Sequence, residues 1–130
     1  MSDRVDVVRR IYEEWGRGNF REGLELYDPH AVFVEGIGPD GGVYYGVDAI
    51  KSFMRGFLGA WAQVTITADE LLPAGESVLA SVHQRGTGNA QGVAAELRYF
   101  QVWTFRGDAV VRLEHFRDRA DALVAIGLKE

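Results

Sequence analysis

Hydrophobic residues recur at helical spacing in three stretches of the first half of the chain. The first stretch carries them every three or four residues, at Val5, Val8, Ile11, Tyr12 and Trp15. It begins near Ser2 or Asp3. The same spacing runs from Asn19, a helix-capping residue type, to Pro29, and it returns after Asp48. The pattern therefore predicts three early amphipathic helices.

Alternation of apolar and polar residues predicts strands elsewhere. Residues 31–35 alternate, which puts Phe33 and Glu35 on one face of a strand. Residues 36–46 hold five glycines and one proline, too many breakers for a regular element, so this segment is predicted to be a loop or a pocket rim. Residues 62–72 and 76–87 alternate again around a turn at 73–75.

The segment 97–118 reads as a β-hairpin. Two runs rich in aromatic and β-branched residues flank Arg106-Gly107-Asp108, a three-residue connection that contains glycine. Pairing Phe105 with Ala109 fixes the predicted register: Trp103 with Val111, Gln101 with Leu113, Tyr99 with His115, Leu97 with Arg117. These residues share one face. The other face then carries Arg98, Phe100, Val102, Thr104, Val110, Arg112, Glu114 and Phe116.

The two faces of this hairpin predict two kinds of contact. The first face is mostly aromatic but includes Gln101 and His115, a composition typical of a ligand pocket. The opposite face is also partly apolar, and the three early helices would leave none to cover it. We therefore expect a homodimer through this outer face, on the residues Phe100, Val102, Val110 and Phe116.

The order of elements predicts the fold class. Three helices with one early strand precede a run of antiparallel strands, and a short helix follows Asp118, burying Leu123 and Ile126. This order is typical of an α+β domain. At 130 residues, the chain is expected to form one domain over residues 1–130.

Composition excludes several classes of function. The net charge of -5 argues against a nucleic-acid partner, because phosphate binding needs a basic surface. No apolar run approaches the ~20 residues of a membrane span, so no membrane partner is expected. The chain has no cysteine, and its first residues lack the apolar core of a signal peptide. These features predict a cytoplasmic protein without thiol chemistry.

Several motifs in order resemble a known family. The segments "VVRRIYEEW", "GRGNF" and "LYDPHAVFVEG", followed by "YGVDAIKSF", "AGESVLASV" and "VWTFRGDAVVRLEHFRDRADALVAIGL", resemble the SnoaL-like branch of the nuclear transport factor 2-like superfamily. The resemblance implies a cone-shaped, curved antiparallel or mixed sheet wrapped around three N-terminal helices, with a short C-terminal helix. This is a cystatin-like α+β barrel with a pocket inside the cone, and usually a dimer. Relatives include ketosteroid isomerases, polyketide cyclases, epoxide hydrolases, dehydratases and non-enzymes, so the fold does not fix the chemistry.

The isomerase branch implies roles for particular positions. Its general-base aspartate falls on Glu35, and its two oxyanion donors, a tyrosine and a protonated aspartic acid, fall on Ile11 and Gln101. Isoleucine cannot donate a hydrogen bond, which argues against steroid isomerisation itself. Gln101 is neutral at every pH and can donate without the raised pKa that the acid requires.

The candidate catalytic residues are Glu35 as base, with Gln101 and His115 as partners. Each has a structural alternative. Glu35 is either a desolvated carboxylate of raised pKa beside Phe33, or a rim residue that lies in water or forms a structural ion pair. His115 either serves as acid, base or ligand donor, or is a structural residue whose ring bonds Tyr99 or a backbone carbonyl. Gln101 bonds either a ligand oxygen, Tyr12 or a water. The predicted ligand-binding wall comprises Tyr12, Trp15, Phe33, Phe53, Phe57, Tyr99, Trp103 and Leu113.

These observations predict a protein that encloses a small apolar or aromatic ligand. If it is an enzyme, an isomerase, cyclase or dehydratase-type reaction by proton transfer with Glu35 as base is expected. The alternative is a non-catalytic binding or accessory protein. No cofactor is expected, and no metal either, because the three histidines lack the paired spacing of metal sites.

Overall fold

The computed structural model describes residues 3–35, 42–88 and 92–128. In chain order its elements are α1 (Asp3–Gly16), the 3-10 helix η1 (Leu24–Leu26), β1 (Tyr27–Glu35), β2 (Gly42–Tyr45), α2 (Val47–Gly59), β3 (Trp61–Ala74), β4 (Ser77–Gly88), β5 (Ala94–Arg106), β6 (Ala109–Phe116) and α3 (Arg119–Ala125). Six strands form one sheet in the order β2-β1-β6-β5-β4-β3. β1 and β6 run parallel, and every other pair is antiparallel.

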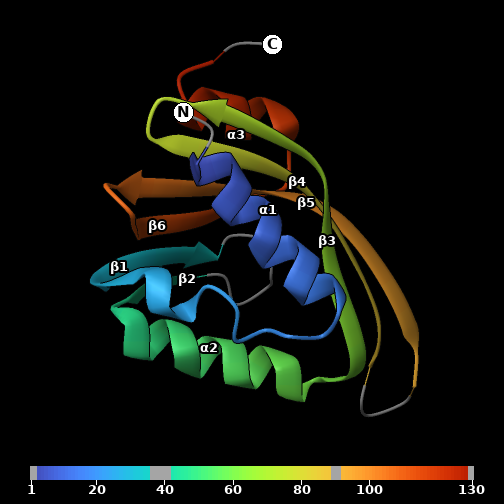
Figure 1. The fold of residues 1–130 in the computed structure, drawn as a ribbon. Coiled ribbons are helices and arrows are strands. Elements are labelled where there is room, and N and C mark those ends of the chain that lie inside the picture. The colour runs from blue at the N-terminus through green and yellow to red at the C-terminus, as the bar shows by residue number, and fades with distance from the viewer. Residues whose placement is uncertain (1–2, 36–41, 89–91, 129–130) are drawn as a thin grey trace.

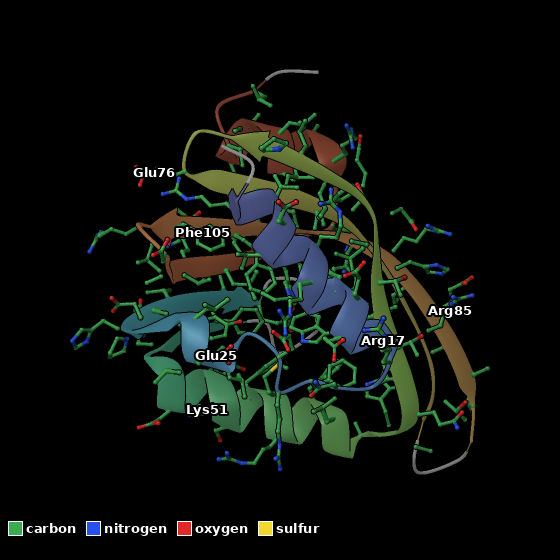
Figure 2. All side chains as sticks on the ribbon, viewed as in Figure 1. Arg17, Glu25, Lys51, Glu76, Arg85 and Phe105 are labelled. Carbon is green, nitrogen blue, oxygen red and sulfur yellow. The ribbon has the colours of Figure 1, made fainter. Side chains whose placement is uncertain are left out.

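The sheet curves around two helices, α1 and α2 (Figure 1). The main core lies between its concave face and these helices, where Val8, Ile11, Ile50 and Trp103 are almost completely buried. Figure 2 shows side chains filling this space, while Lys51 and Arg85 point outward. The predicted α+β class with a curved mixed sheet is confirmed, but the sheet does not close into a barrel.

The segment between α1 and β1 differs from the predicted second helix. Residues 20–23 form turns, η1 has three residues, and the strand already starts at Tyr27 and includes Pro29. Gly23 has φ +90°, and a Cβ at this position would lie 2.9 Å from Ile11 Cδ1. This left-handed residue packed on α1 interrupts helical geometry, so the apolar spacing after Asn19 fills the core from turns instead.

The glycine-rich segment 36–46 also contains more regular structure than expected. β2 pairs with β1, from Val32 opposite Tyr45 to Glu35 opposite Gly42. β2 is an edge strand of the sheet, where the backbone forms hydrogen bonds to a neighbour on one side only, so glycine is tolerated in it. The remainder of the predicted loop, residues 36–41, lies outside the described residues, as does Ser2 at the predicted start of the first helix.

The β5–β6 hairpin has a different register from the predicted one. Its turn has two residues, Gly107 and Asp108, because Arg106 pairs with Ala109. A bulge follows, so Phe105 pairs with Val110 but Thr104 with Arg112. The shorter turn and the bulge each shift the pairing by one residue relative to the predicted register. Because the total shift is two residues, every residue beyond the bulge stays on its predicted face. Between the turn and the bulge the faces differ from the prediction: Val110 is buried in the inner core and not on the outer face, and Ala109 pairs with Arg106 and not with Phe105.

A helix covers part of the outer sheet face, contrary to expectation. Ala122 and Leu123 of α3 pack against Leu79 and Val102. Phe100 and Phe116 border this second cluster. The C-terminal helix therefore buries apolar residues that the sequence had left to a partner subunit.

Candidate functional site

An apolar pocket of about 250 Å³ lies between the helices and the concave sheet face. Most of its wall is apolar or aromatic: Trp15, Phe33, Phe53, Met54, Phe57, Trp61, Ile66, Leu97, Tyr99 and Leu113. Four polar side chains complete the wall: Glu35, Gln84, Gln101 and His115. An apolar cavity with a few convergent polar groups is the usual form of a small-molecule site.

Other hollows on the surface are larger but of another character. One of about 380 Å³ runs between α1 and β3 and is lined by charged residues, including Arg9, Glu13 and Asp69. Such a surface is already well solvated, so it offers a ligand little apolar area to bury. The smaller apolar pocket is the better candidate site.

Aromatic contacts fix one wall of the pocket. The ring of Phe33 lies 4.9 Å from those of Phe53 and His115, between centroids, in edge-to-face geometry. Tyr44 of β2 packs 4.9 Å from Phe53. These edge-to-face contacts are favourable beyond the area they bury, and they hold α2 against β1 and β6.

A chain of buried hydrogen bonds runs behind the pocket. Trp103 Nε1 donates to the hydroxyl of Tyr12 over 2.8 Å, and that hydroxyl donates to Oε1 of Gln101. Gln101 Nε2 in turn contacts Nε2 of His115, directly opposite it in the β5–β6 ladder. Tyr12, Trp103 and Gln101 are each at most 3% exposed. The chain therefore connects α1 to the sheet through groups without access to bulk water.

The direction of this chain fixes the tautomer of His115. The indole of Trp103 can only donate, and Tyr12 passes its own proton to the carbonyl oxygen of Gln101. The amide nitrogen of Gln101 then has to donate to His115 Nε2, so the ring proton of neutral His115 lies on Nδ1. Nδ1 is 3.7 Å from Oε1 of Glu35, and both side chains are nearly buried, at 11% and 13% exposure.

Burial controls the titration of these groups. Desolvation lowers the pKa of His115, and the neighbouring Glu35 carboxylate offsets this in part by favouring the imidazolium. Desolvation likewise raises the pKa of Tyr12 and of Tyr99. At neutral pH the site therefore contains protonated tyrosines and a neutral histidine whose Nε2 lone pair accepts from Gln101, which leaves Glu35 as the group suited to accept a proton from a ligand.

A second polar pair lies elsewhere on the pocket wall. The hydroxyl of Tyr99 donates to Oε1 of Gln84 over 2.7 Å. Gln84 is 4% exposed and Tyr99 is 6% exposed. Burial of a glutamine side chain is uncommon and requires polar partners.

The structure brings together most of the sequence-predicted site. Glu35, Gln101 and His115 are adjacent, and the walls include Trp15, Phe33, Phe53, Phe57, Tyr99 and Leu113. Tyr12 and Trp103 lie behind Gln101 as part of the hydrogen-bond chain, and not among the lining residues.

The lining residues absent from the predicted set are Met54, Trp61, Ile66, Gln84 and Leu97. The alternation that puts Val78, Ala80 and Val82 on one face of β4 also assigns Gln84 to it, so the sequence carried this signal.

The described residues also bear on metal binding and on membrane insertion. No group of three or more His, Cys, Asp or Glu side chains there is arranged to hold a metal ion. None of the helices in this part of the chain has the length and apolar character needed to cross a membrane.

Comparisons with known proteins give a consistent result for the fold. The family model of the SnoaL-like domain matches residues 8–113. No curated protein matches the chain. Among solved structures, an NTF2-like protein of unknown function from Burkholderia pseudomallei is similar at 26% identity, with a TM-score of 0.79, over 97% of this chain and 98% of that one.

Two further solved structures are similar in fold. A proposed SnoaL-like polyketide cyclase from Jannaschia sp. CCS1 has 14% identity and a TM-score of 0.75 over 97% of this chain and 92% of that one. TerC, co-crystallised with polyporic acid, has 19% identity and a TM-score of 0.74 over 94% of this chain and 95% of that one. At these identities the likeness concerns the fold.

Proposed function

The chain belongs to the SnoaL-like domain family, and on this basis we propose that it binds a small apolar or aromatic ligand and transfers a proton with Glu35 as base. The observation that carries the proposal is the position of the Glu35 carboxylate on an apolar pocket wall, 3.7 Å from the Nδ1 of a buried His115. A carboxylate in such surroundings is poorly hydrated, which favours proton transfer from a weak carbon acid.

The proposed reaction class is proton abstraction next to a carbonyl group. The ligand C–H bond breaks, its proton goes to the Glu35 carboxylate, and the electron pair moves toward the carbonyl oxygen. The amide nitrogen of Gln101 has a second hydrogen besides the one donated to His115, and Gln101 lines the pocket, so this hydrogen is available to the oxygen. Return of the proton from Glu35 to another carbon completes an isomerisation. In a cyclisation the enolate carbon attacks a second carbonyl of the same ligand, and Glu35 returns its proton to the alkoxide oxygen that forms.

The volume of the pocket limits the ligand. An apolar cavity of ~150 Å³ holds one benzene molecule. The present pocket of about 250 Å³ therefore suits two fused rings, or one ring with substituents, and is small for four fused rings. This limit supports the sequence argument against steroid isomerisation.

The test uses 2-tetralone, a two-ring ketone with acidic C–H groups, as probe. Wild type should accelerate exchange of these hydrogens in D2O, followed by proton NMR, whereas Glu35→Gln should abolish the acceleration. Calorimetry should give similar affinities for 2-tetralone in both proteins, since the substitution keeps the size of the side chain. Acceleration retained in Glu35→Gln would refute the role of Glu35.

A non-catalytic binding protein is the alternative function. It is favoured by the wall composition, in which ten of fourteen lining residues are apolar or aromatic. Binding of 2-tetralone by wild type without any acceleration of exchange would support this alternative.

A further inference from the structure

Gln84 is held in a defined orientation on the pocket wall. It lies on β4, in the ladder position opposite Leu97 of β5 and Ile66 of β3. The hydroxyl of Tyr99 donates to its Oε1 over 2.7 Å, so the carbonyl end of the amide is engaged with the protein. The end that remains is the amide nitrogen, which carries two donor hydrogens.

These donors lack a protein partner among the described residues, although Gln84 is only 4% exposed. Another polar atom of the pocket wall, Nε1 of Trp15, is completely buried and forms no hydrogen bond in this part of the chain, whereas the amide nitrogen of Gln84 is not among the completely buried unpaired atoms and so keeps some access to the pocket. The backbone of Gly16, next to Trp15, packs closely on Thr67, the neighbour of Ile66. Both unpaired donors therefore belong to the region where α1 ends on β3 and β4.

This region and Glu35 belong to different strands of the sheet. Glu35 belongs to β1 and Gln84 to β4, and β6 and β5 lie between these strands. Three strand spacings of ~4.8 Å each amount to about 14 Å measured along the curved sheet, and Tyr99, which bonds Gln84 and whose ring lies 5.3 Å from that of His115, stands between the two groups. The pocket thus has a carboxylate on one side of Tyr99 and the Gln84 donor on the other.

The charge of the wall restricts what these donors can bind. None of the described lining residues is a lysine or an arginine, and Glu35 contributes a carboxylate. An anionic ligand would lose its hydration without gaining a countercharge, which is costly in an apolar cavity. A neutral oxygen acceptor, by contrast, satisfies donors that are otherwise unpaired.

We propose that Gln84, oriented by Tyr99, forms a specificity subsite for a neutral acceptor oxygen on the ligand, at the end opposite the group that faces Glu35. The substrate class is then a neutral compound of about two rings with a carbonyl at one end and an ether, carbonyl or hydroxyl oxygen at the other. This inference rests on the proposed function, because it assigns the orientation of the ligand that Glu35 would deprotonate.

The experiment compares two probes of equal shape, 6-methoxy-2-tetralone and 6-ethyl-2-tetralone, in which CH2 replaces the ether oxygen. Calorimetry should show that wild type binds the methoxy probe about three- to tenfold more tightly, as one net neutral hydrogen bond provides. Gln84→Met should bring the ratio to about one. His83→Gln is the matched control. His83 precedes Gln84 on β4 and is also buried, but it bonds Glu96 of β5 and does not line the pocket. This variant should keep the wild-type ratio of affinities for the two probes.

A measurement on wild type alone covers the case in which Gln84→Met does not fold. The side-chain amide protons of Gln84 should move downfield in the NMR spectrum with the methoxy probe and stay in place with the ethyl probe. A third probe, 6-carboxy-2-tetralone, should bind more weakly than the ethyl probe, and tighter binding would refute the assignment of a neutral acceptor.

The outcomes separate this inference from the proposed function. Equal affinity of wild type for the methoxy and ethyl probes, with catalysed exchange intact, would overturn the subsite and leave Glu35 as base. A wild-type ratio that persists in Gln84→Met would overturn it as well. Absence of binding by every probe would overturn both proposals.

Discussion

Removal of the Tyr12 hydroxyl should destabilise the protein much more than removal of another tyrosine hydroxyl from the same core. In Tyr12→Phe, the indole N–H of Trp103 and the carbonyl oxygen of Gln101 both lose their partner. Each orphaned buried group costs ~1–3 kcal/mol, and the removed hydroxyl no longer has to be desolvated, which offsets one such amount. We therefore expect the free energy of unfolding to fall by about 2 kcal/mol, within a range of ~1–3 kcal/mol, or the Tm by about 8 °C for a chain of this size.

The matched control is Tyr27→Phe. The ring of Tyr27 also packs on Trp103, with 6.4 Å between centroids, and its hydroxyl has no hydrogen-bond partner among the described residues. The same atom is removed from the same cluster, but no bond is lost, so the change should stay within ~0.5 kcal/mol. Urea unfolding of the three proteins at pH 7.5 measures the difference, and an equal effect of the two substitutions would refute the hydrogen-bond chain.

A second readout in Tyr12→Phe tests the direction of the chain. Without Tyr12 the amide of Gln101 is free to turn its oxygen toward His115, which then favours the protonated ring. The pKa of His115 should rise toward its ordinary value, measured by NMR titration of the imidazole. An unchanged pKa would show that Tyr12 does not orient Gln101.

Three further predictions follow from burial and packing. Burial lowers the pKa of His115 in the folded state, so the unfolded chain binds more protons and stability should fall as the pH drops below ~6.5. His115→Gln should flatten this part of the pH profile in urea unfolding, and an unchanged profile would contradict the lowered pKa of His115. In Gly86→Ala the new Cβ would lie 2.4 Å from Gln63 O and 2.6 Å from the Trp61 ring, so the free energy of unfolding should fall by about 2 kcal/mol and the tryptophan fluorescence should change. In the control Gly88→Ala the nearest atom to the new Cβ is 3.7 Å away, so neither quantity should change much. We propose that the part of the outer face outside α3 forms a homodimer, which sedimentation at micromolar concentration should detect; a monomer would rule it out.

The sequence predicted the inner face of the hairpin for a physical reason. Side chains alternate with a period of two, so only an odd shift moves a residue to the other face. The two-residue turn and the bulge each changed the register by one, and Gln101 and His115 stayed on one face as direct neighbours. Val110, between the turn and the bulge, experienced one shift alone, and its face was predicted wrongly.

Other features depended on contacts that periodicity does not encode. The apolar spacing after Asn19 is compatible with a helix, but the close packing of Gly23 on Ile11 selects turns. The cover of the outer face was missed because α3 was counted as a tail, although its buried Leu123 was predicted. Tertiary packing decides between such options, since local propensities differ by less than the free energy of burying a side chain.

The choice between Glu35 and His115 as base shows what the structure adds to the sequence. Sequence reasoning assigned both residues to the catalytic set, and by residue type alone either could accept a proton near neutral pH. The hydrogen bonds remove this symmetry, because the lone pair of His115 Nε2 is used by Gln101, and its Nδ1 carries a hydrogen that faces Glu35. A histidine in this state orients a carboxylate and stabilises its negative charge, but it has no free lone pair for the ligand. Trp103 can only donate, and Tyr12, which accepts from it, passes its own proton to the carbonyl oxygen of Gln101, so the amide nitrogen of Gln101 is the end that faces His115. The assignment of the base to Glu35 therefore follows from a chain of hydrogen bonds in which two members, Trp103 and Tyr12, do not line the pocket.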